Sequence, residues 1–456
     1  MISRRTVLTG TALTALGALP AAAASPAAPP PARRRRQARP NLLVLVTDDQ
    51  PMDTGWGLPR LHRHMAEQGV TFTFAHTTTP LCAPARSSIM TGRRAHHHGV
   101  RDNRHPRRLD ATRTLQHRLR ETGYRTGMVG KYLNGWRAED APPFFEHYAM
   151  MARPRYEDAL WSVNGGRYKR SQYTTSVVRD EALSFLGEPD PRPWFLYVAP
   201  YAPHAPYHPE PKYADLEVPP WTPGPDAAEP DRSDKPPYIR DSEATVTDGR
   251  ELRAKQLRAL RSVDDLFAAL VAGLRASGQL ENTVIAVISD NGYSWSQHGW
   301  LRKSVPYAPA VRVPLWLAWP RGGLGGGRAD GRMAANIDLA PTLLEAAGAE
   351  PLPCDGRSLL STWDRPELVI EWWNGREKIA HQPPTWTSLL SRDRQYTEYL
   401  DTYLDAEGRP TEGTGAVVFR EYYDLRSDPD QLRNLLPEGA DPARLGAQLR
   451  RLRSGA

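Results

Sequence analysis

The sequence predicts an α/β protein with a large, mostly parallel sheet flanked by helices and a small C-terminal α+β subdomain. Two apolar runs, residues 41–47 and 283–289, lack polar alternation, which indicates strands buried on both faces. Residues 250–277 carry apolar side chains at helical spacing and stop before Gly278, so they predict a long amphipathic helix. From about residue 359 the pattern changes to short β-like runs, which predicts the separate subdomain.

Composition and charge exclude several classes of protein. The chain has 456 residues, 40% of them hydrophobic, and can bury a large core. Removing the seven arginines of residues 1–39 from the 59 basic residues leaves 52, equal to the 52 acidic residues, so we expect no nucleic-acid surface. Two cysteines, Cys82 and Cys354, exclude a disulfide scaffold. No apolar run after the first twenty residues could cross a bilayer, so we expect no stable membrane insertion.

Residues 1–24 predict a twin-arginine export signal, in which Arg4 and Arg5 precede a weakly apolar stretch and an alanine-rich zone. An ordinary Sec signal and a disordered tail are the alternatives. Residues 25–39 contain several prolines and four consecutive arginines and predict a flexible linker, although the arginines could also contact an acidic polymer. The signal implies a bacterial protein that is secreted or extracytoplasmic, with the twin-arginine translocase as a partner.

Four predicted strands end in side chains that can bind metals or transfer protons. In chain order these are Asp48 and Asp49 after 41–47, Lys131 after 127–130, His204 after 194–200, and Asp290 and Asn291 after 283–289. Ligands of such sheets bind outside the carboxyl ends of the strands, so we expect these side chains to form one site. Residues 205–248 are rich in proline and predict a long surface excursion over this edge, and residues 337–347 predict another helix.

Asp48, Asp49, Asp290 and Asn291 predict a metal site. Carboxylate and amide oxygens select a hard cation such as Ca²⁺ or Mg²⁺. Three buried carboxylates without a cation would repel one another and be costly to desolvate. The alternative is that each pair only caps a turn, but the presence of both pairs at equivalent strand ends favours the metal.

Cys82 lies at the start of a predicted helix, with Pro84 in its first turn and Gly92 just past its end. Backbone N–H groups at a helix N-terminus favour an anion, and Arg86, one turn further on, could hold an oxyanion. These residues by themselves leave open whether Cys82 is an activated thiolate nucleophile or a buried structural cysteine.

The run Cys82-x-Pro84-x-Arg86, followed by Ser-Ser-Ile-Met-Thr-Gly, resembles the signature of type I sulfatases, in which the cysteine becomes Cα-formylglycine. The resemblance continues in order along the body of the chain. It includes Asp48-Asp49-Gln50, Gly130–Asn134, Pro203–Pro206, Asp290–Tyr293, His298-Gly299, Lys303, Asp338–Leu344 and the stretch from Tyr423 to Leu435. Within the family, Gly-Lys-Tyr-Leu-Asn and Asp-Asn-Gly-Tyr are most similar to the N-acetylglucosamine-6-sulfatase branch.

The resemblance implies an alkaline-phosphatase-like sandwich, with a sulfatase catalytic domain at residues 40–358 and a subdomain at residues 359–456. It also implies that a formylglycine-generating enzyme oxidises Cys82 to an aldehyde, whose hydrate attacks sulfur. Asp290 would accept a proton from the nucleophile, and His204 would protonate the leaving alcohol. The remaining catalytic side chains would be Arg86, Lys131 and Lys303, which hold the hydrate and the sulfate oxygens. The metal ligands would be Asp48, Asp49, Cys82, Asp290 and Asn291.

One position departs from the pattern of many sulfatases, which carry a histidine two residues after the motif lysine. Here that position is Leu133, so the substrate contact falls to Asn134, our assignment, or to another side chain, and His298 is a second expected substrate contact. Whether one of His96, His97 and His98 lines the pocket, or all three form a solvated loop, stays open. Three aromatic side chains could stack on a sugar or pack in the core: Tyr207, Trp295 and Trp300.

We therefore expect a secreted sulfatase that acts on sulfated sugars or glycosaminoglycan fragments and depends on Ca²⁺, with Mg²⁺ as the alternative metal. A phosphodiester or phosphonate monoester hydrolase on the same scaffold is the second hypothesis. A carbohydrate-binding protein whose Cys82 stays a thiol is the third. Sulfate and phosphate esters would distinguish the first two, and the chemical state of Cys82 would identify the third.

Overall fold

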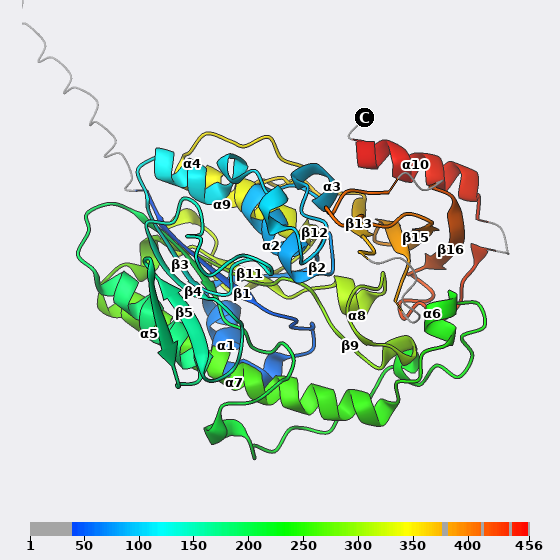
Figure 1. Ribbon diagram of the computed structural model, residues 1–456, viewed down its shortest axis with the longest axis horizontal. Coiled ribbons are helices and arrows are strands. Elements are labelled where there is room, and N and C mark those ends of the chain that lie inside the picture. The colour runs from blue at the N-terminus through cyan, green and yellow to red at the C-terminus, as the bar shows by residue number, and fades with distance from the viewer. Residues whose placement is uncertain (1–38, 376–381, 412–414, 437–439, 455–456) are drawn as a thin grey trace, which may run out of the picture. The chain divides into compact units, whose positions relative to one another are not determined.

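A mixed sheet of ten strands forms the centre of the described part of the chain (Figure 1). The computed structural model describes residues 39–375, 382–411, 415–436 and 440–454, so the predicted export signal and residues 25–38 of the linker lie outside the described residues. In spatial order the strands are β12 (Arg328–Ala335), β2 (Val70–His76), β11 (Leu315–Ala318), β8 (Thr283–Ser289), β1 (Asn41–Thr47), β7 (Trp194–Ala199), β3 (Arg125–Gly130), β4 (His147–Met151), β5 (Ala159–Val163) and β6 (Gly166–Arg170).

The middle of this sheet is parallel. Strands β8, β1, β7, β3 and β4 run side by side in the same direction, whereas β11 and β5 are antiparallel to their neighbours in this block. Strand β6 is antiparallel to β5. Strands β1 and β8 pair along their whole length, from Asn41 opposite Thr283 to Thr47 opposite Ser289. Asp48 and Asp290 therefore leave the sheet next to each other. The predicted α/β class with a mostly parallel sheet is confirmed.

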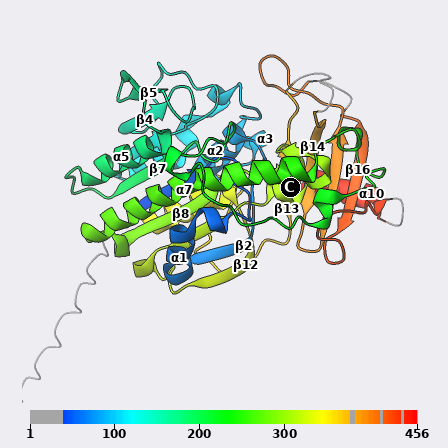
Figure 2. The same ribbon diagram turned by 90° about the horizontal axis from the view of Figure 1, so that it is seen from below.

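Helices cover both faces of the sheet (Figures 1 and 2). One face carries α2 (Cys82–Thr91), α4 (Leu115–Glu121) and α9 (Leu339–Ala347), and the other carries α1 (Pro59–Gln68), α5 (Thr174–Gly187) and α7 (Val246–Ala276). Along β1, Leu42 and Val44 belong to the first core and Leu43 and Leu45 to the second. The unbroken apolar run follows from this, because alternate side chains of the strand enter two different cores.

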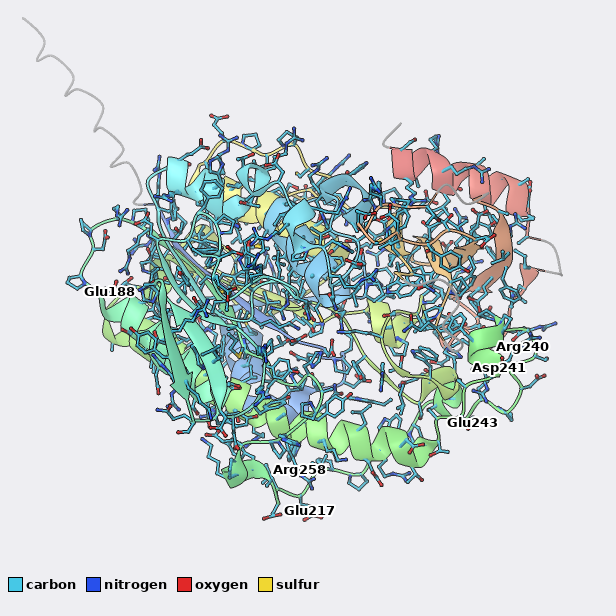
Figure 3. The ribbon with its side chains drawn as sticks, viewed as in Figure 1. Glu188, Glu217, Arg240, Asp241, Glu243 and Arg258 are labelled. Atoms are coloured by element: carbon cyan, nitrogen blue, oxygen red, sulfur yellow. The ribbon has the colours of Figure 1, made fainter. Side chains whose placement is uncertain are left out.

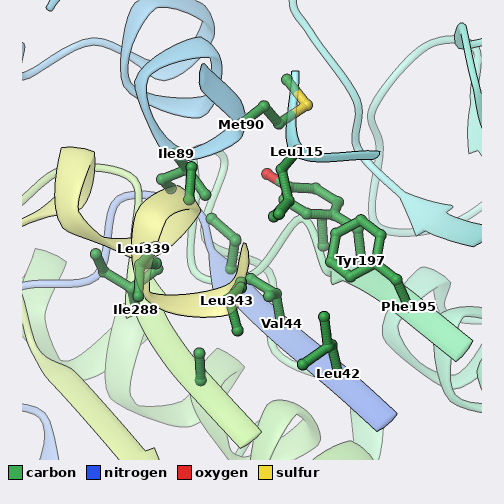
Figure 4. Packing of buried hydrophobic residues seen from close by; sticks show 14 of the residues in the cluster. Leu42, Val44, Ile89, Met90, Leu115, Phe195, Tyr197, Ile288, Leu339 and Leu343 are labelled. Carbon is green, nitrogen blue, oxygen red and sulfur yellow. The ribbon is translucent and has the colours of Figure 1, made fainter. Parts of the chain in front are cut away.

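Figure 4 shows the first of these cores. Leu42 and Val44 of β1 lie beneath Ile89 of α2 and Leu343 of α9, and all four side chains are buried. Complete burial of one such aliphatic side chain contributes about 1.5–3 kcal/mol. Packing of α2 against β1 therefore fixes the helix N-terminus relative to the end of the strand.

The ends of two of the predicted helices have local causes. Helix α2 ends before Gly92, whose φ of 68° lies in the left-handed region that glycine adopts most readily. Helix α7 begins four residues earlier than predicted, because Thr245 and Asp248 form a capping box at its N-terminus.

Shorter elements complete the main body. They are α3 (Ala95–His98), α6 (Pro237–Arg240), α8 (Ala308–Val311), β9 (Ser294–Trp295) and β10 (Leu301–Arg302). Single 3-10 turns span Gly55–Gly57, Pro106–Arg108, Ala111–Arg113, Pro211–Tyr213, Pro225–Ala228, Leu280–Asn282, Gln297–Gly299, Pro320–Gly322 and Asn336–Asp338. Among the described residues, no helix combines the length and the apolar character needed to cross a membrane.

The C-terminal region contains, within its described residues, a four-stranded antiparallel sheet and one long helix. The elements are β13 (Leu368–Trp372), β14 (Thr385–Leu390), β15 (Arg394–Leu400), β16 (Val417–Asp424) and α10 (Pro442–Ser454). Helix α10 covers one face, where Leu449 packs with Val369. On the other face Ile370 shares a core with Tyr307 and Ile337 of the main body. The predicted α+β character is confirmed, while a domain boundary at residue 358 stays a prediction.

Candidate active site

The carboxyl ends of β1 and β8 bring two acidic pairs together. Asp48, Asp49, Asp290 and Asn291 are all buried. The Asp49 N–H donates to Asp290 Oδ1 at 3.1 Å, and the Asn291 side-chain amide donates to Asp49 Oδ1 at 2.8 Å. The structure thus places the four side chains of the predicted metal site in one polar cluster.

Each of the three buried carboxylates has a cationic partner: Asp48 pairs with Lys131, Asp49 with Lys303, and Asp290 with Arg86. The Arg86 Nε–Asp290 Oδ2 distance is 2.9 Å, and both side chains are inaccessible to solvent. Removing one partner of such a pair leaves an uncompensated buried charge, at a cost of about 3–5 kcal/mol. The cluster is therefore a set of three interdependent ion pairs.

These cations keep the aspartates ionised. Burial alone would raise the pKa of Asp48, but Lys131, His204 and Arg86 outweigh it and lower that pKa to about 2. Burial alone would also raise the pKa of Asp49, but nearby cations lower it, and the charge of Lys303 has the largest lowering effect. Both groups are carboxylates at neutral pH, which is the form that binds a cation.

Cys82 is the first residue of α2, and its side chain is fully buried. Its Sγ lies 3.4 Å from Asp48 Oδ1 and 2.8 Å from Lys303 Nζ. Burial raises the pKa of this thiol to about 12 despite the nearby lysines, so it is protonated at neutral pH. This finding speaks against the activated thiolate that the sequence left open.

One ligand atom from each of Asp48, Asp49, Cys82 and His204 lies within 4.8 Å of the others, which makes this group a candidate metal site. Lys303 Nζ hydrogen-bonds Asp49 Oδ1 and lies 2.8 Å from Cys82 Sγ and 3.5 Å from Asn291 Oδ1. Three of the predicted ligands therefore face the Lys303 ammonium group, and the chemistry of their donor atoms fits a metal ion. These ligands are Asp49, Cys82 and Asn291. His204 was expected only as a proton donor, and the structure brings it to the same cluster.

Two tyrosines that no sequence pattern indicates, Tyr201 and Tyr156, contact His204. The Tyr201 ring stacks on the imidazole with centroids 4.8 Å apart, and the Tyr156 hydroxyl donates to the His204 carbonyl at 2.6 Å. His204 Nδ1 lies 2.8 Å from the Ala205 carbonyl and must donate to it, so Nε2 is directed to Asp49 Oδ2 at 3.7 Å. No sequence pattern connects Tyr156 with His204, because 48 residues separate them.

One nitrogen of the Arg86 guanidinium, Nη2, forms no hydrogen bond with the described residues. Its Nε binds Asp290, and its Nη1 donates to the Lys131 carbonyl at 3.1 Å. Nη2 is buried 3.8 Å from Asp48 Oδ1 and has no hydrogen-bond partner among the described residues. A buried unsatisfied donor is costly, so this N–H group is suited to an anionic oxygen that enters the site.

A cleft of about 970 Å³ opens above Asp49, His204 and Lys303. Its wall includes Tyr207 and Trp300, two of the three aromatic residues that were considered for sugar stacking. The third, Trp295, is buried and donates from its indole to Gln256 Oε1 at 2.6 Å, as a core residue does.

The structure does not bring every predicted residue into this cleft. His298 is 1% exposed, with Nδ1 2.8 Å from Glu229 and its ring packed on Tyr307, and it does not line the cleft. Asn134 also lies outside the cleft lining, although its Oδ1 is buried with no partner in the described part of the chain.

The three consecutive histidines have structural partners rather than a place in the cleft. His96 contacts Glu371 at 2.7 Å, His97 contacts Asp355 at 2.8 Å, and His98 lies 3.1 Å from the Ser88 hydroxyl. None of the three lines the cleft above Cys82.

The fold and the site define an enzyme of the α/β class, whose catalytic centre lies at the carboxyl ends of parallel strands below an open cleft. Residues 40–349 match the family model described as Sulfatase. The chain belongs to the sulfatase family.

Individual relatives agree with this assignment. The chain is 31% identical to N-acetylglucosamine-6-sulfatase of Homo sapiens, with 91% of this chain and 84% of that protein covered. It is 30% identical to the extracellular sulfatase SULF-1 homolog of Drosophila melanogaster, where 82% of this chain matches but the chain spans only 37% of that protein.

A solved structure agrees with the fold. The structure of BT4656 in complex with its substrate D-glucosamine-2-N,6-O-disulfate superposes with a TM-score of 0.78 at 20% identity, covering 91% of this chain and 97% of that chain. The expected alkaline-phosphatase-like sulfatase fold is thereby confirmed.

Proposed function

We propose that this chain is a metal-dependent sulfatase that hydrolyses the sulfate esters of sulfated sugars with a Cα-formylglycine formed from Cys82. The observation that carries the proposal is the position of Cys82 Sγ, 3.4 Å from Asp48 and 2.8 Å from Lys303 at the first turn of α2. A buried, protonated thiol is a poor nucleophile, whereas an aldehyde hydrate at the same point offers hydroxyl groups between carboxylates and cations. A formylglycine-generating enzyme would be the maturation partner.

The donor set supports a hard divalent cation, which we take to be Ca²⁺ with Mg²⁺ as the alternative. The ligands would be Asp48, Asp49, Asp290, Asn291 and residue 82, and His204 lies close enough to contribute. When bound, the cation would supply Lewis-acid activation of the nucleophile.

The remaining side chains have roles that follow from their contacts. Lys131 and Lys303 direct ammonium groups into the cluster, and Arg86 has its free Nη2, so these cations would bind the oxygens of the sulfate group. His204 Nδ1 donates to a backbone carbonyl and Nε2 faces the centre, so Nε2 carries a proton only in the imidazolium form, and in that form it would give this proton to the leaving oxygen. Asp290 stays our choice for the group that accepts the proton of the nucleophile.

Amino sugars with a sulfate ester are the substrate class that we infer. One relative is named an N-acetylglucosamine-6-sulfatase, and the BT4656 structure contains a disulfated glucosamine. The cleft of about 970 Å³ with Tyr207 and Trp300 in its wall offers aromatic surfaces for a sugar ring. Fragments of glycosaminoglycans would belong to this substrate class.

The decisive test combines mass spectrometry with an ester panel. Protein purified from its native host is digested with trypsin, and the mass of peptide His64–Arg86 is measured. We expect the mass for an aldehyde in place of the Cys82 thiol, together with sulfate release from glucosamine 6-sulfate and from an aryl sulfate. Active protein with an unmodified thiol would overturn the mechanism. Faster turnover of phosphodiesters or phosphonate monoesters would favour the second hypothesis.

We also propose that the protein is exported by the twin-arginine translocase, on the basis of Arg4 and Arg5 before the apolar stretch. Replacement of both arginines by lysine should retain the protein in the cytoplasm of a twin-arginine-competent host. Unchanged export of this variant would instead indicate the Sec route.

A further inference from the structure

A second cavity, of about 520 Å³, lies next to the hairpin of β5 and β6. Among the described residues its charged lining is mainly basic. The cations are Arg137, Arg153, Arg155, Arg167 and Lys169, and the acids are Glu139 and Asp158.

The acids of this cavity already have partners. Glu139 is 2.7 Å from Arg167, and Asp158 is 3.6 Å from Lys169. Arg153 and Arg155 are exposed and form no ion pair with any residue that the structure describes. The cavity therefore has uncompensated positive charge, which favours an anionic ligand.

Two chain segments contribute residues both to this cavity and to the surroundings of the catalytic centre. The segment after β3 begins with Lys131, which pairs with Asp48, and six residues later contributes Arg137 to the cavity. The segment between β4 and β5 contributes Arg153 and Arg155 to the cavity. In the same segment, the Tyr156 hydroxyl hydrogen-bonds the backbone of His204. Both segments leave the same edge of the sheet as Asp48, because β1, β3 and β4 are parallel.

The distance between the catalytic centre and the basic cavity suits an oligosaccharide. Strand β4 is three strand positions from β1, which corresponds to roughly 14 Å at the usual spacing of neighbouring strands. A single sugar ring does not cover this distance, whereas a chain of several rings does.

The opposite wall of the active-site cleft carries both charges. Asp241, Glu243 and Arg302 line the cleft above Cys82, and none of them forms an ion pair within the described residues. Asp241 and Glu243 lie in the segment after α6, on the side of the molecule away from β4 and β5 (Figures 1 and 3). This wall has less uncompensated positive charge than the basic cavity, so a polyanionic chain would be attracted toward the arginines of the cavity.

We propose that the basic cavity is a subsite that binds a further sulfate or carboxylate group of the same oligosaccharide whose sulfate ester reacts at residue 82. The inference rests on the proposed sulfatase function and deepens it, because it selects polyanionic oligosaccharides over monosaccharides. The binding groups are the guanidinium groups of Arg153 and Arg155, which can each grip a sulfate or carboxylate with two N–H groups.

The test compares two substrates on the full-length enzyme. One is a heparin-derived tetrasaccharide, and the other is a tetrasaccharide of neutral sugars and amino sugars that carries one sulfate, on its terminal sugar, and no carboxylate. The variant is R153A/R155A, and the matched control is R321A/R328A, which removes two exposed arginines near the N-terminal end of β12, at the other end of the sheet. We expect the variant to raise KM for the heparin tetrasaccharide about 10-fold, with an unchanged kcat and unchanged kinetics on the singly sulfated substrate.

Salt provides a second readout. Raising the ionic strength should increase KM for the heparin tetrasaccharide in the native enzyme and in the control, and this dependence should weaken in R153A/R155A. Equal kinetics of native enzyme and variant on the heparin tetrasaccharide would overturn the subsite. An equal loss on both substrates would also overturn it, because the arginines would then act on the catalytic centre.

Direct binding separates this inference from the proposed function. Calorimetric titration of the heparin tetrasaccharide does not require turnover. If no ester is hydrolysed but binding depends on Arg153 and Arg155, the proposed function fails and the anion-binding cavity stands. If esters are hydrolysed and binding is the same in R153A/R155A, the cavity fails and the sulfatase stands.

Discussion

Lys303 Nζ lies 2.8 Å from Cys82 Sγ and at the same time hydrogen-bonds Asp49 Oδ1. The two residues come from distant parts of the chain, the start of α2 and the segment after β10. Their contact places a permanent positive charge beside the proposed nucleophile, because the pKa of Lys303 is raised well above its usual value: the surrounding acids outweigh burial, which alone would lower it. Lys303 thus connects the nucleophile to the acidic cluster.

Replacing Lys303 by methionine keeps the length of the side chain but removes this charge. We expect kcat for sulfate esters to fall about 100- to 1000-fold, as happens when one charge-stabilising donor is removed. Without metal the unpaired Asp49 should also lower the stability by about 3–5 kcal/mol. Saturating Ca²⁺ should restore the stability but not kcat. Lys255→Met on the exposed face of α7 is the control and should change neither quantity.

The two cysteines allow a matched comparison. Cys82→Ala removes the precursor of the proposed nucleophile, so we expect at least a 1000-fold loss of sulfate release, on the order of the losses seen for other covalent nucleophiles. Cys354→Ala should keep the activity, because Cys354 lies beside Gly92, at the end of α2 opposite to Cys82, and among the described residues its thiol bonds the Gly356 carbonyl at 3.4 Å. Residual turnover of Cys82→Ala within tenfold of the native enzyme, roughly 1.4 kcal/mol, would contradict the proposed nucleophile.

Metal dependence can be measured by unfolding as well as by activity. Ca²⁺ at about 100 times its Kd should raise the free energy of unfolding by about 2.7 kcal/mol, and chelation should remove both this gain and the activity. Asp49→Asn should abolish the Ca²⁺ effect. Asp53→Asn, four residues further on and exposed, should leave it unchanged. If both variants respond to Ca²⁺ like the native protein, Asp49 is not a ligand.

His98 should make the fold sensitive to acid. Burial lowers its pKa from 6.5 to about 3, so between these values the unfolded chain binds a proton that the folded chain does not. Stability should therefore fall as the pH drops below 6.5, with His98 contributing about 1.4 kcal/mol per pH unit. His98→Asn retains an acceptor for the Val100 N–H and removes this contribution. Denaturant unfolding between pH 7 and pH 5 measures the slope, and identical slopes for both proteins would refute the assignment.

Several parts of the fold could be predicted from the sequence because their signals are local. Strands β1 and β8 match the predicted ranges residue for residue, since a continuous apolar run is enough to identify a strand buried on both faces. Strands β14 and β15 were not predicted. Thr387 and Gln395 are polar side chains buried within that small sheet, which hides the apolar pattern that reveals a strand.

In the candidate active site, too, some residues could be predicted from the sequence and others could not. Asp48 and Asp290 could be paired from the sequence, because both directly follow parallel strands that end at one edge. The roles of Tyr156 and Glu229 could not be predicted, since their contacts with His204 and His298 join loops of unrelated sequence. His298 follows the end of β8 and is an expected substrate contact, and no pattern in the sequence indicates that the fold buries it against Glu229.

The α/β class, the sulfatase motif around Cys82, and the acids and bases that converge at the strand ends can be predicted without a structure, because they depend on spacing along the chain. The folded structure is needed to see which cation neutralises which carboxylate, that the Cys82 side chain is buried between Asp48 and Lys303, and that a basic cavity lies to one side of the site. Electrostatic pairing and desolvation depend on distances in space, and the folded packing of distant segments sets those distances.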